Sequence, residues 1–191
     1  MSTTRLEAFS DAVIAIIMTI MVLELPRPHG ADLAALRPVY PTALGYLLSF
    51  VFLGIYWNNH HHMMHLVTRV NGSVLWANMH LLFWLSLVPF ATGWMGETHL
   101  APVPTAAYGV VLIMAAAAYS LLQRAVFRLE GPESPLHRAI GIGLKERASL
   151  AFYAMAIIAA WFAPRVAVAL YVAVAVMWLR PDRRVEAVLD R

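Results

Sequence analysis

The sequence predicts an all-α membrane protein that crosses the bilayer six times. Of its 191 residues, 61% are hydrophobic and only 13% are charged, a composition typical of polytopic membrane proteins. The apolar residues fall into six segments, for which we expect helices at about 5–25, 40–66, 72–95, 104–128, 147–163 and 165–180. We expect these helices to form a single transmembrane domain that takes in the whole chain, residues 1–191.

The number of spans depends on the last two segments, which are shorter than the roughly 20 residues that a spanning helix needs. Pro164 and Arg165 separate them. One helix through both would be about 48 Å long, too long for a hydrocarbon core about 30 Å thick. With six spans and both termini in the cytoplasm, only three of the 14 Lys and Arg residues lie outside: Arg27, Arg37 and Arg165. This strong positive-inside bias favours six helices in a cell membrane.

The composition and the motifs exclude several classes of protein. The chain has no Cys, so it holds no disulfide framework, thiolate metal site or cysteine nucleophile. The net charge of +3 is modest and follows the topology, which argues against nucleic-acid binding. The sequence has no GxSxG or HExxH motif and no visible inverted repeat of the kind common in secondary transporters. We therefore expect neither an enzyme nor a bound cofactor.

The first helix, residues 5–25, combines a spanning apolar sequence with ionisable side chains. Such groups are costly in a bilayer and usually face other helices or a water-filled path. At about 100° per residue, Ile16, Ile20 and Leu23 form one narrow stripe, with Thr19 on its edge. The stripe either packs against lipid or another helix, or forms a hydrophobic constriction around an axis shared by several subunits. Periodicity alone leaves both interpretations open.

Two polar residues of the first helix point away from this stripe. Ser10 and Asp11 lie about 120–140° from Ile16, one on either side. We assign both to interhelical contacts that hold the first helix in place, rather than to a ring of charge around a pore. Before them, Thr4 and Glu7 match a capping box, which would fix the start of the helix.

The second helix ends in a polar cluster at the same membrane depth as Asp11. The cluster includes an indole, an amide and two imidazoles: Trp57, Asn59, His60 and His61. We expect a His or Asn of this cluster to hydrogen-bond Asp11, because an unpaired carboxylate is costly at this depth. Asn78, near the start of the third helix, is expected to join the same network.

Four short motifs follow a common pattern. The first helix has Arg5 followed by Phe9, Ser10 and Asp11, with Thr19 eight residues after the Asp. The later motifs are Trp57-x-Asn59-His60-His61, Trp76-x-Asn78 and Pro89-Phe90-x-Thr92. Together they resemble the signature of the transmembrane protein 175 family, the endosomal and lysosomal potassium channels and their bacterial relatives. The chain departs from this pattern at Ala12, where Gly is frequent, and at Ile14, where Phe is usual.

The resemblance implies a homo-tetrameric, potassium-permeable cation channel in the lipid bilayer. It implies that the first helices of four subunits surround the pore, and that Ile16, Ile20 and Leu23 form its constriction, with Thr19 at the edge. The chain has no TVGYG loop whose carbonyl groups would replace water around an ion. Selectivity would then come from partial dehydration at aliphatic rings, which predicts modest discrimination of potassium from sodium.

An alternative is a membrane protein that binds a metal ion or haem through histidines. His61 and His65 are four residues apart and share a helix face, and His80 lies on the next helix. Against this alternative, we see no Cys or carboxylate that completes a site around these residues. We therefore expect no bound metal, and a metal analysis of the purified protein distinguishes the two hypotheses.

Overall fold

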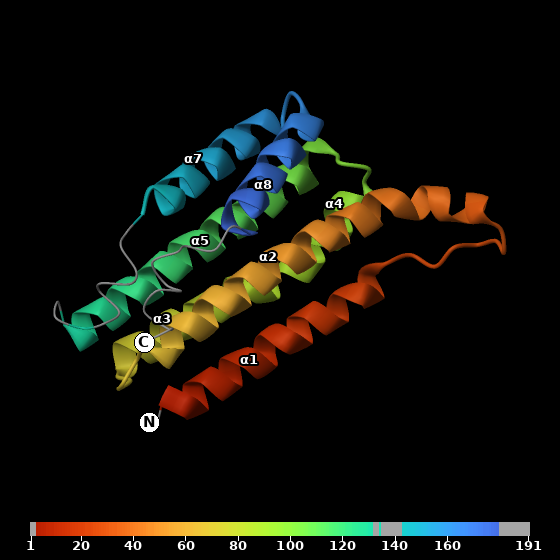
Figure 1. Ribbon diagram of the computed structural model, residues 1–191. Coiled ribbons are helices and arrows are strands. Elements are labelled where there is room, and N and C mark those ends of the chain that lie inside the picture. The colour runs from red at the N-terminus through yellow and green to blue at the C-terminus, as the bar shows by residue number, and fades with distance from the viewer. Residues whose placement is uncertain (1–2, 132–133, 135–142, 180–191) are drawn as a thin grey trace.

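Every regular element in the described part of the chain is a helix (Figure 1). The computed structural model describes residues 3–131, 134 and 143–179. The elements η1 and η2 are short 3₁₀ helices, and the others are α-helices. In chain order they are α1 (Thr3–Ile20), η1 (Met21–Glu24), η2 (Leu33–Val39), α2 (Tyr40–His65), α3 (Gly72–Ser86), α4 (Val88–Glu97), α5 (Pro102–Glu130), α7 (Leu144–Ala159) and α8 (Pro164–Leu179).

Four helical stretches are long and apolar enough to cross a membrane: Thr3–Glu24, Leu33–His65, Gly72–Glu97 and Pro102–Glu130. The third stretch contains both α3 and α4, while α7 and α8 have only 16 residues each. When each of these stretches is counted as one helix and α7 and α8 are added, the described residues form an all-helical membrane protein with six helices, four of which are long spans. This confirms the predicted all-α membrane protein with six helices, and the passage of α7 and α8 across the bilayer stays a prediction.

Two prolines mark the places where helices break. The third span is interrupted at Leu87 because Pro89 has no N–H to donate to the carbonyl of Leu85, four residues earlier. Pro164 begins α8 after a turn in which the N–H of Ala163 donates to the carbonyl of Ala159 at 2.7 Å. The chain reverses at this turn, so α7 and α8 form a hairpin whose helices pack side by side (Figure 1).

The longest helix, α5, packs against α3, α4, α7 and α8 and forms the centre of the bundle. Its buried face is completely inaccessible to solvent at Tyr108, Leu112, Ala115, Ala118 and Leu122. The two alanines let neighbouring backbones approach closely, which favours helix association in lipid. The interior of the bundle is therefore filled by side chains rather than by a water path.

A buried cluster of hydroxyl groups links α2, α4 and α5. The Ser49 Oγ lies 2.6 Å from the Thr92 Oγ1 and 2.9 Å from the Tyr108 hydroxyl. The Thr92 hydroxyl donates to the carbonyl of Val88, so it accepts from Ser49, which in turn accepts from Tyr108. Because each hydroxyl has a partner, the cost of burying it is offset, and the cluster fixes how these helices pack.

The first helix lies along one edge of the bundle (Figure 1). It packs on α2 and α3 and touches α4 near its far end. Only 28% of the most apolar stretch of this first span is buried, compared with 56% of the corresponding stretch in α5. The helix therefore leaves one face free for lipid or for another copy of the chain.

We expect Gly96→Ala to separate α2 from α4. A Cβ at Gly96 would lie 2.7 Å from the Cα of Thr42, which is buried backbone that cannot move aside cheaply. Such overpacking costs about 1–3 kcal/mol of stability. The matched control is Gly54→Ala in α2, where a Cβ would meet no atom within 4 Å. Thermal unfolding in detergent should show a lower midpoint for Gly96→Ala and no loss for Gly54→Ala; equal midpoints would contradict the close packing.

Candidate functional site

One face of α1 is turned away from the rest of the chain. Ile16, Ile20 and Leu23 are 58%, 42% and 78% exposed. Thr19 is also exposed, and its hydroxyl donates to the carbonyl of Ile16 at 2.9 Å. The stripe predicted from the sequence is thus a continuous aliphatic surface on the outside of the single chain.

The opposite face of α1 is buried. Leu6, Ser10, Ile14, Ile17 and Met21 follow each other at helical spacing, and each is at most 3% exposed. This face packs against α2 and α3. The helix is therefore held by one face while it displays the other.

The last turn of this segment differs from the α-helix expected up to residue 25. The α-helix ends at Ile20, and Met21–Glu24 forms the 3₁₀ helix η1. Residues three apart eclipse one another in a 3₁₀ helix, so Leu23 lies directly beyond Ile20. The tighter winding therefore keeps the aliphatic stripe narrow at this end.

A buried hydrogen-bonded chain joins α1, α2 and α3. The His60 Nε2 lies 2.8 Å from the Asn78 Oδ1, and the Asn78 Nδ2 donates to the Ser10 Oγ at 2.9 Å. The Ser10 hydroxyl donates onward to the carbonyl of Leu6 at 2.8 Å. Because the amide oxygen can only accept, His60 donates through Nε2–H. Ser10, His60 and Asn78 are each 0% exposed, so this chain fixes the contact among three helices.

The partner of Asp11 is an indole, not the His or Asn expected from the sequence. The Trp57 Nε1–H donates to the Asp11 Oδ1 at 3.1 Å. Asn78 joins the network through Ser10 instead. The reason is geometric: Ser10 and Asp11 are neighbours on α1, about 100° apart, so one meets α3 and the other meets α2.

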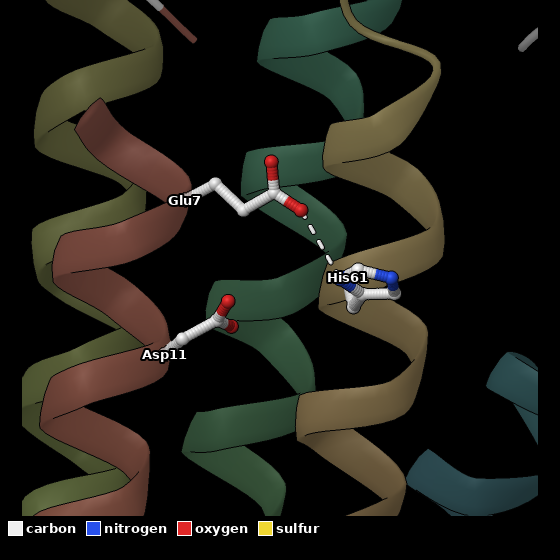
Figure 2. Close-up of side chains that lie close together, drawn as sticks. All are labelled: Glu7, Asp11 and His61. Carbon is white, nitrogen blue, oxygen red and sulfur yellow. Dashed lines mark ion pairs between the residues drawn. The ribbon is translucent and has the colours of Figure 1, made fainter. Parts of the chain in front are cut away.

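Glu7 faces α2 beside Asp11. The capping box expected for Thr4 and Glu7 is wrong, because α1 already includes Thr3 and Thr4 therefore lies inside the helix. The Glu7 Oε1 lies 3.1 Å from the Nδ1 of His61, a distance at which the two form an ion pair when the imidazole is protonated (Figure 2). The His61 ring stacks on Trp57, with centroids 5.9 Å apart and planes 21° apart. Glu7 was not among the predicted site residues, although its spacing of four from Asp11 places both carboxylates on one helix face.

Three motif residues lie outside these contacts. Arg5 and Phe9 are exposed on α1, on the side of the aliphatic stripe. The Asn59 Nδ2 donates to the carbonyl of Ile55 in its own helix, and the backbone carbonyl of Asn59 accepts from the Tyr119 hydroxyl at 3.1 Å. Asn59 therefore links α2 to α5, not to α1.

The structure changes the case for a metal site. His80 does not join His61, because its Nε2 accepts from the Trp84 indole on its own helix at 2.9 Å. Two carboxylates do lie beside His61, contrary to the expectation that none completes a site: Glu7, Asp11 and His61 each offer a ligand atom, all within 4.8 Å of one another (Figure 2). These three residues are the set that the described part of the chain offers to a metal ion.

Comparison with known proteins identifies the family. A family model described as endosomal/lysosomal potassium channel TMEM175 matches residues 5–89. A protein from Chryseobacterium sp. (strain P1-3), named as a potassium channel, is 53% identical over 186 residues, which are 97% of each chain. The chain belongs to the TMEM175 family. The resemblance of its motifs to that family is thereby confirmed.

Two more distant relatives carry different names, and the solved structure of one of them shares the fold. The crystal structure of a lysosomal potassium-selective channel TMEM175 homolog from Chamaesiphon minutus has a TM-score of 0.76 and 25% sequence identity, covering 93% of this chain and 96% of that one. The Gallus gallus protein, named an endosomal/lysosomal proton channel, is 34% identical over 103 residues. Those residues are 48% of this chain but only 21% of the Gallus protein.

Proposed function

We propose that four copies of this chain surround an axis and form a potassium-permeable cation channel, with α1 of each copy lining the pore. The observation that carries this proposal is the exposed aliphatic stripe on a helix at the edge of the bundle. The names of the Chryseobacterium and Chamaesiphon relatives support potassium as the permeant ion.

A pore between copies fits the chain better than a pore within it. The interior around α5 is filled by Tyr108, Leu112 and Leu122, and its hydroxyl cluster is internally paired. A helix that lines a shared axis must lie at the edge of each subunit, as α1 does. Its buried polar contacts to α2 and α3 orient it, so that the same face points outward in every copy.

The constriction consists of stacked rings of Ile16, Ile20 and Leu23 from the four copies. Aliphatic rings of this kind gate by dewetting. A cation passes only after it sheds part of its water. Because potassium sheds water more easily than sodium, the pore prefers potassium over sodium, by a modest ratio. Thr19 presents a hydroxyl oxygen at the edge of the constriction, where it partly replaces the lost water.

The chain lies in the cell membrane with both termini on the cytoplasmic side, so Ile16 forms the ring nearest the cytoplasm. The distribution of Lys and Arg supports this orientation, because cytoplasmic loops carry the excess of positive charge. Glu24, exposed just beyond Leu23, then lies at the outer mouth. There its carboxylate raises the local concentration of cations.

We expect the purified protein to release potassium from proteoliposomes faster than sodium, and to have the mass of four chains in detergent. Potassium and sodium efflux from matched vesicles, with empty vesicles as the control, tests the conduction. Light scattering coupled to gel filtration tests the assembly. A dye-reported proton flux without potassium flux would contradict the proposed ion and favour the activity named for the Gallus relative. A monomer would contradict the pore.

A further inference from the structure

Two carboxylates and one imidazole converge where the N-terminal half of α1 meets the C-terminal end of α2. In Figure 2, Glu7 and Asp11 extend from one helix toward His61 on the facing helix. One donor atom from each residue lies within 4.8 Å of the other two. All three residues are partly buried, so the space between them is sheltered but reachable from water.

We propose that Glu7, Asp11 and His61 form a binding site for a divalent first-row transition metal ion, best represented by Zn²⁺, which bridges α1 and α2. Imidazole and carboxylate together suit Zn²⁺ and its neighbours, whereas Ca²⁺ and Mg²⁺ prefer oxygen ligands alone. The two carboxylates, four residues apart on one helix face, repel each other. A cation between them removes that repulsion.

The buried ring nitrogen of His61 also supports a metal ion at this position. Its Nδ1 is buried and lies 3.1 Å from a carboxylate oxygen of Glu7, yet it makes no hydrogen bond within the described part of the chain. The two atoms are close but not aligned for an N–H···O bond. A buried nitrogen that faces carboxylates without a hydrogen bond is available as a lone-pair donor to a metal ion.

Trp57 holds Asp11 and His61 in place. Its indole N–H donates to the Oδ1 of Asp11 at 3.1 Å, and its ring stacks on His61. Hydrogen bonds to ligating carboxylates and packing against ligating imidazoles are the usual supports of a metal site. One residue of α2 therefore orients ligands from both helices.

The cluster is slightly wider than a loaded site. Donor atoms around tetrahedral Zn²⁺ lie about 3.3 Å apart, as follows from bond lengths near 2.0 Å. The donors here are within 4.8 Å of one another, and the Glu7 Oε1 is already 3.1 Å from the His61 Nδ1, so the remaining adjustment is small enough for side-chain rotation. Three protein ligands leave a fourth position for water.

A metal ion at this position would stabilise the packing of α1 on α2. Its effect on conduction rests on the proposed function, in which α1 lines the pore. A ligand shifts an equilibrium toward the state that binds it better. Zn²⁺ on the side of the N-terminus should therefore change potassium flux by favouring the arrangement of α1 described here.

The test is calorimetric titration of ZnCl₂ into the purified, chelator-treated protein, prepared without a histidine tag. We expect one Zn²⁺ per chain for the wild type. Glu7→Gln and His61→Gln should each weaken binding about tenfold or more. The matched control is His29→Gln, which removes an exposed imidazole from the loop before η2 and should leave the affinity unchanged. Gel filtration and thermal unfolding establish that each variant is folded.

Absence of wild-type binding, or equal affinity in all three variants, would overturn the site. Potassium flux with and without Zn²⁺ then tests the consequence for conduction. Flux that responds to Zn²⁺ in the wild type and in His29→Gln, but not in Glu7→Gln, supports the bridge. Binding without any change in flux would overturn the effect on α1. A wild type that binds Zn²⁺ but conducts nothing contradicts the proposed function and leaves the metal site supported.

Discussion

Ile16→Asn is expected to remove the preference for potassium over sodium while cation flux persists. Ile16 is the aliphatic ring nearest the cytoplasm in the proposed pore, and its side chain is 58% exposed on the single chain. An amide at this position hydrates the constriction, so ions no longer shed water to pass. Bi-ionic reversal potentials should move toward a permeability ratio of about 1 in the variant.

The control for this substitution is Ile158→Asn. Ile158 lies near the end of α7 and is 64% exposed, close to the value for Ile16, but it belongs to a different face of the chain. We expect the potassium selectivity of the Ile158→Asn variant to equal that of the wild type. A preserved preference in Ile16→Asn would move the selective region to another part of α1. An equal loss in both variants would mean that any new amide on the surface disturbs the channel.

The sequence predicted those features of the fold that depend on local pattern. The spacing of Ile16, Ile20 and Leu23 placed them on one face, and the structure leaves that face exposed. Pro164 separated the last two helices, and the chain reverses there. Such features follow from helix periodicity and from the chemistry of proline, both of which act over a few residues.

The partners of the polar residues were less predictable. Trp57 bonds Asp11 from 46 positions away, and Asn78 bonds Ser10 from 68 positions away. Several polar side chains lie at the same membrane depth, and their rotation about each helix axis decides which of them meet. The sequence predicts the membrane depth of a side chain, but the rotation of its helix about the axis is set by the packing of all helices together. For the same reason Glu7 was assigned to a helix cap although it faces His61.

The pore itself lies beyond what one chain contains. The aliphatic stripe is a surface whose partner is, in our proposal, another copy of the same surface. A single sequence shows that such a surface exists, and the family resemblance indicated what it forms. The structure adds the physical reason for its orientation: the buried face of α1 is fixed by Ser10, which Asn78 holds from α3.

Asn78→Leu is therefore expected to destabilise the protein and to reduce its conduction. Asn78 is 0% exposed and bonds both Ser10 and His60. Leucine fills a similar volume but leaves the His60 ring without a partner. Leaving a buried polar group unsatisfied costs about 1–3 kcal/mol, or roughly 5–10 °C in Tm for about 2.5 kcal/mol in a chain of this size. Thermal unfolding in detergent measures the loss, with the exposed Asn58→Leu of α2 as the matched control.

A double substitution at Asn78 and His60 tests the cause of this loss more sharply than the single substitution does. If the loss comes from the unpaired imidazole, His60→Leu added to Asn78→Leu should recover part of the stability, because an apolar pair has no unmet hydrogen bond. Flux should stay low in the double variant, since Ser10 has still lost its contact with α3 and the rotation of α1 is no longer fixed. Additive losses of stability would show that Asn78 and His60 act independently, and normal flux would show that this contact does not orient α1.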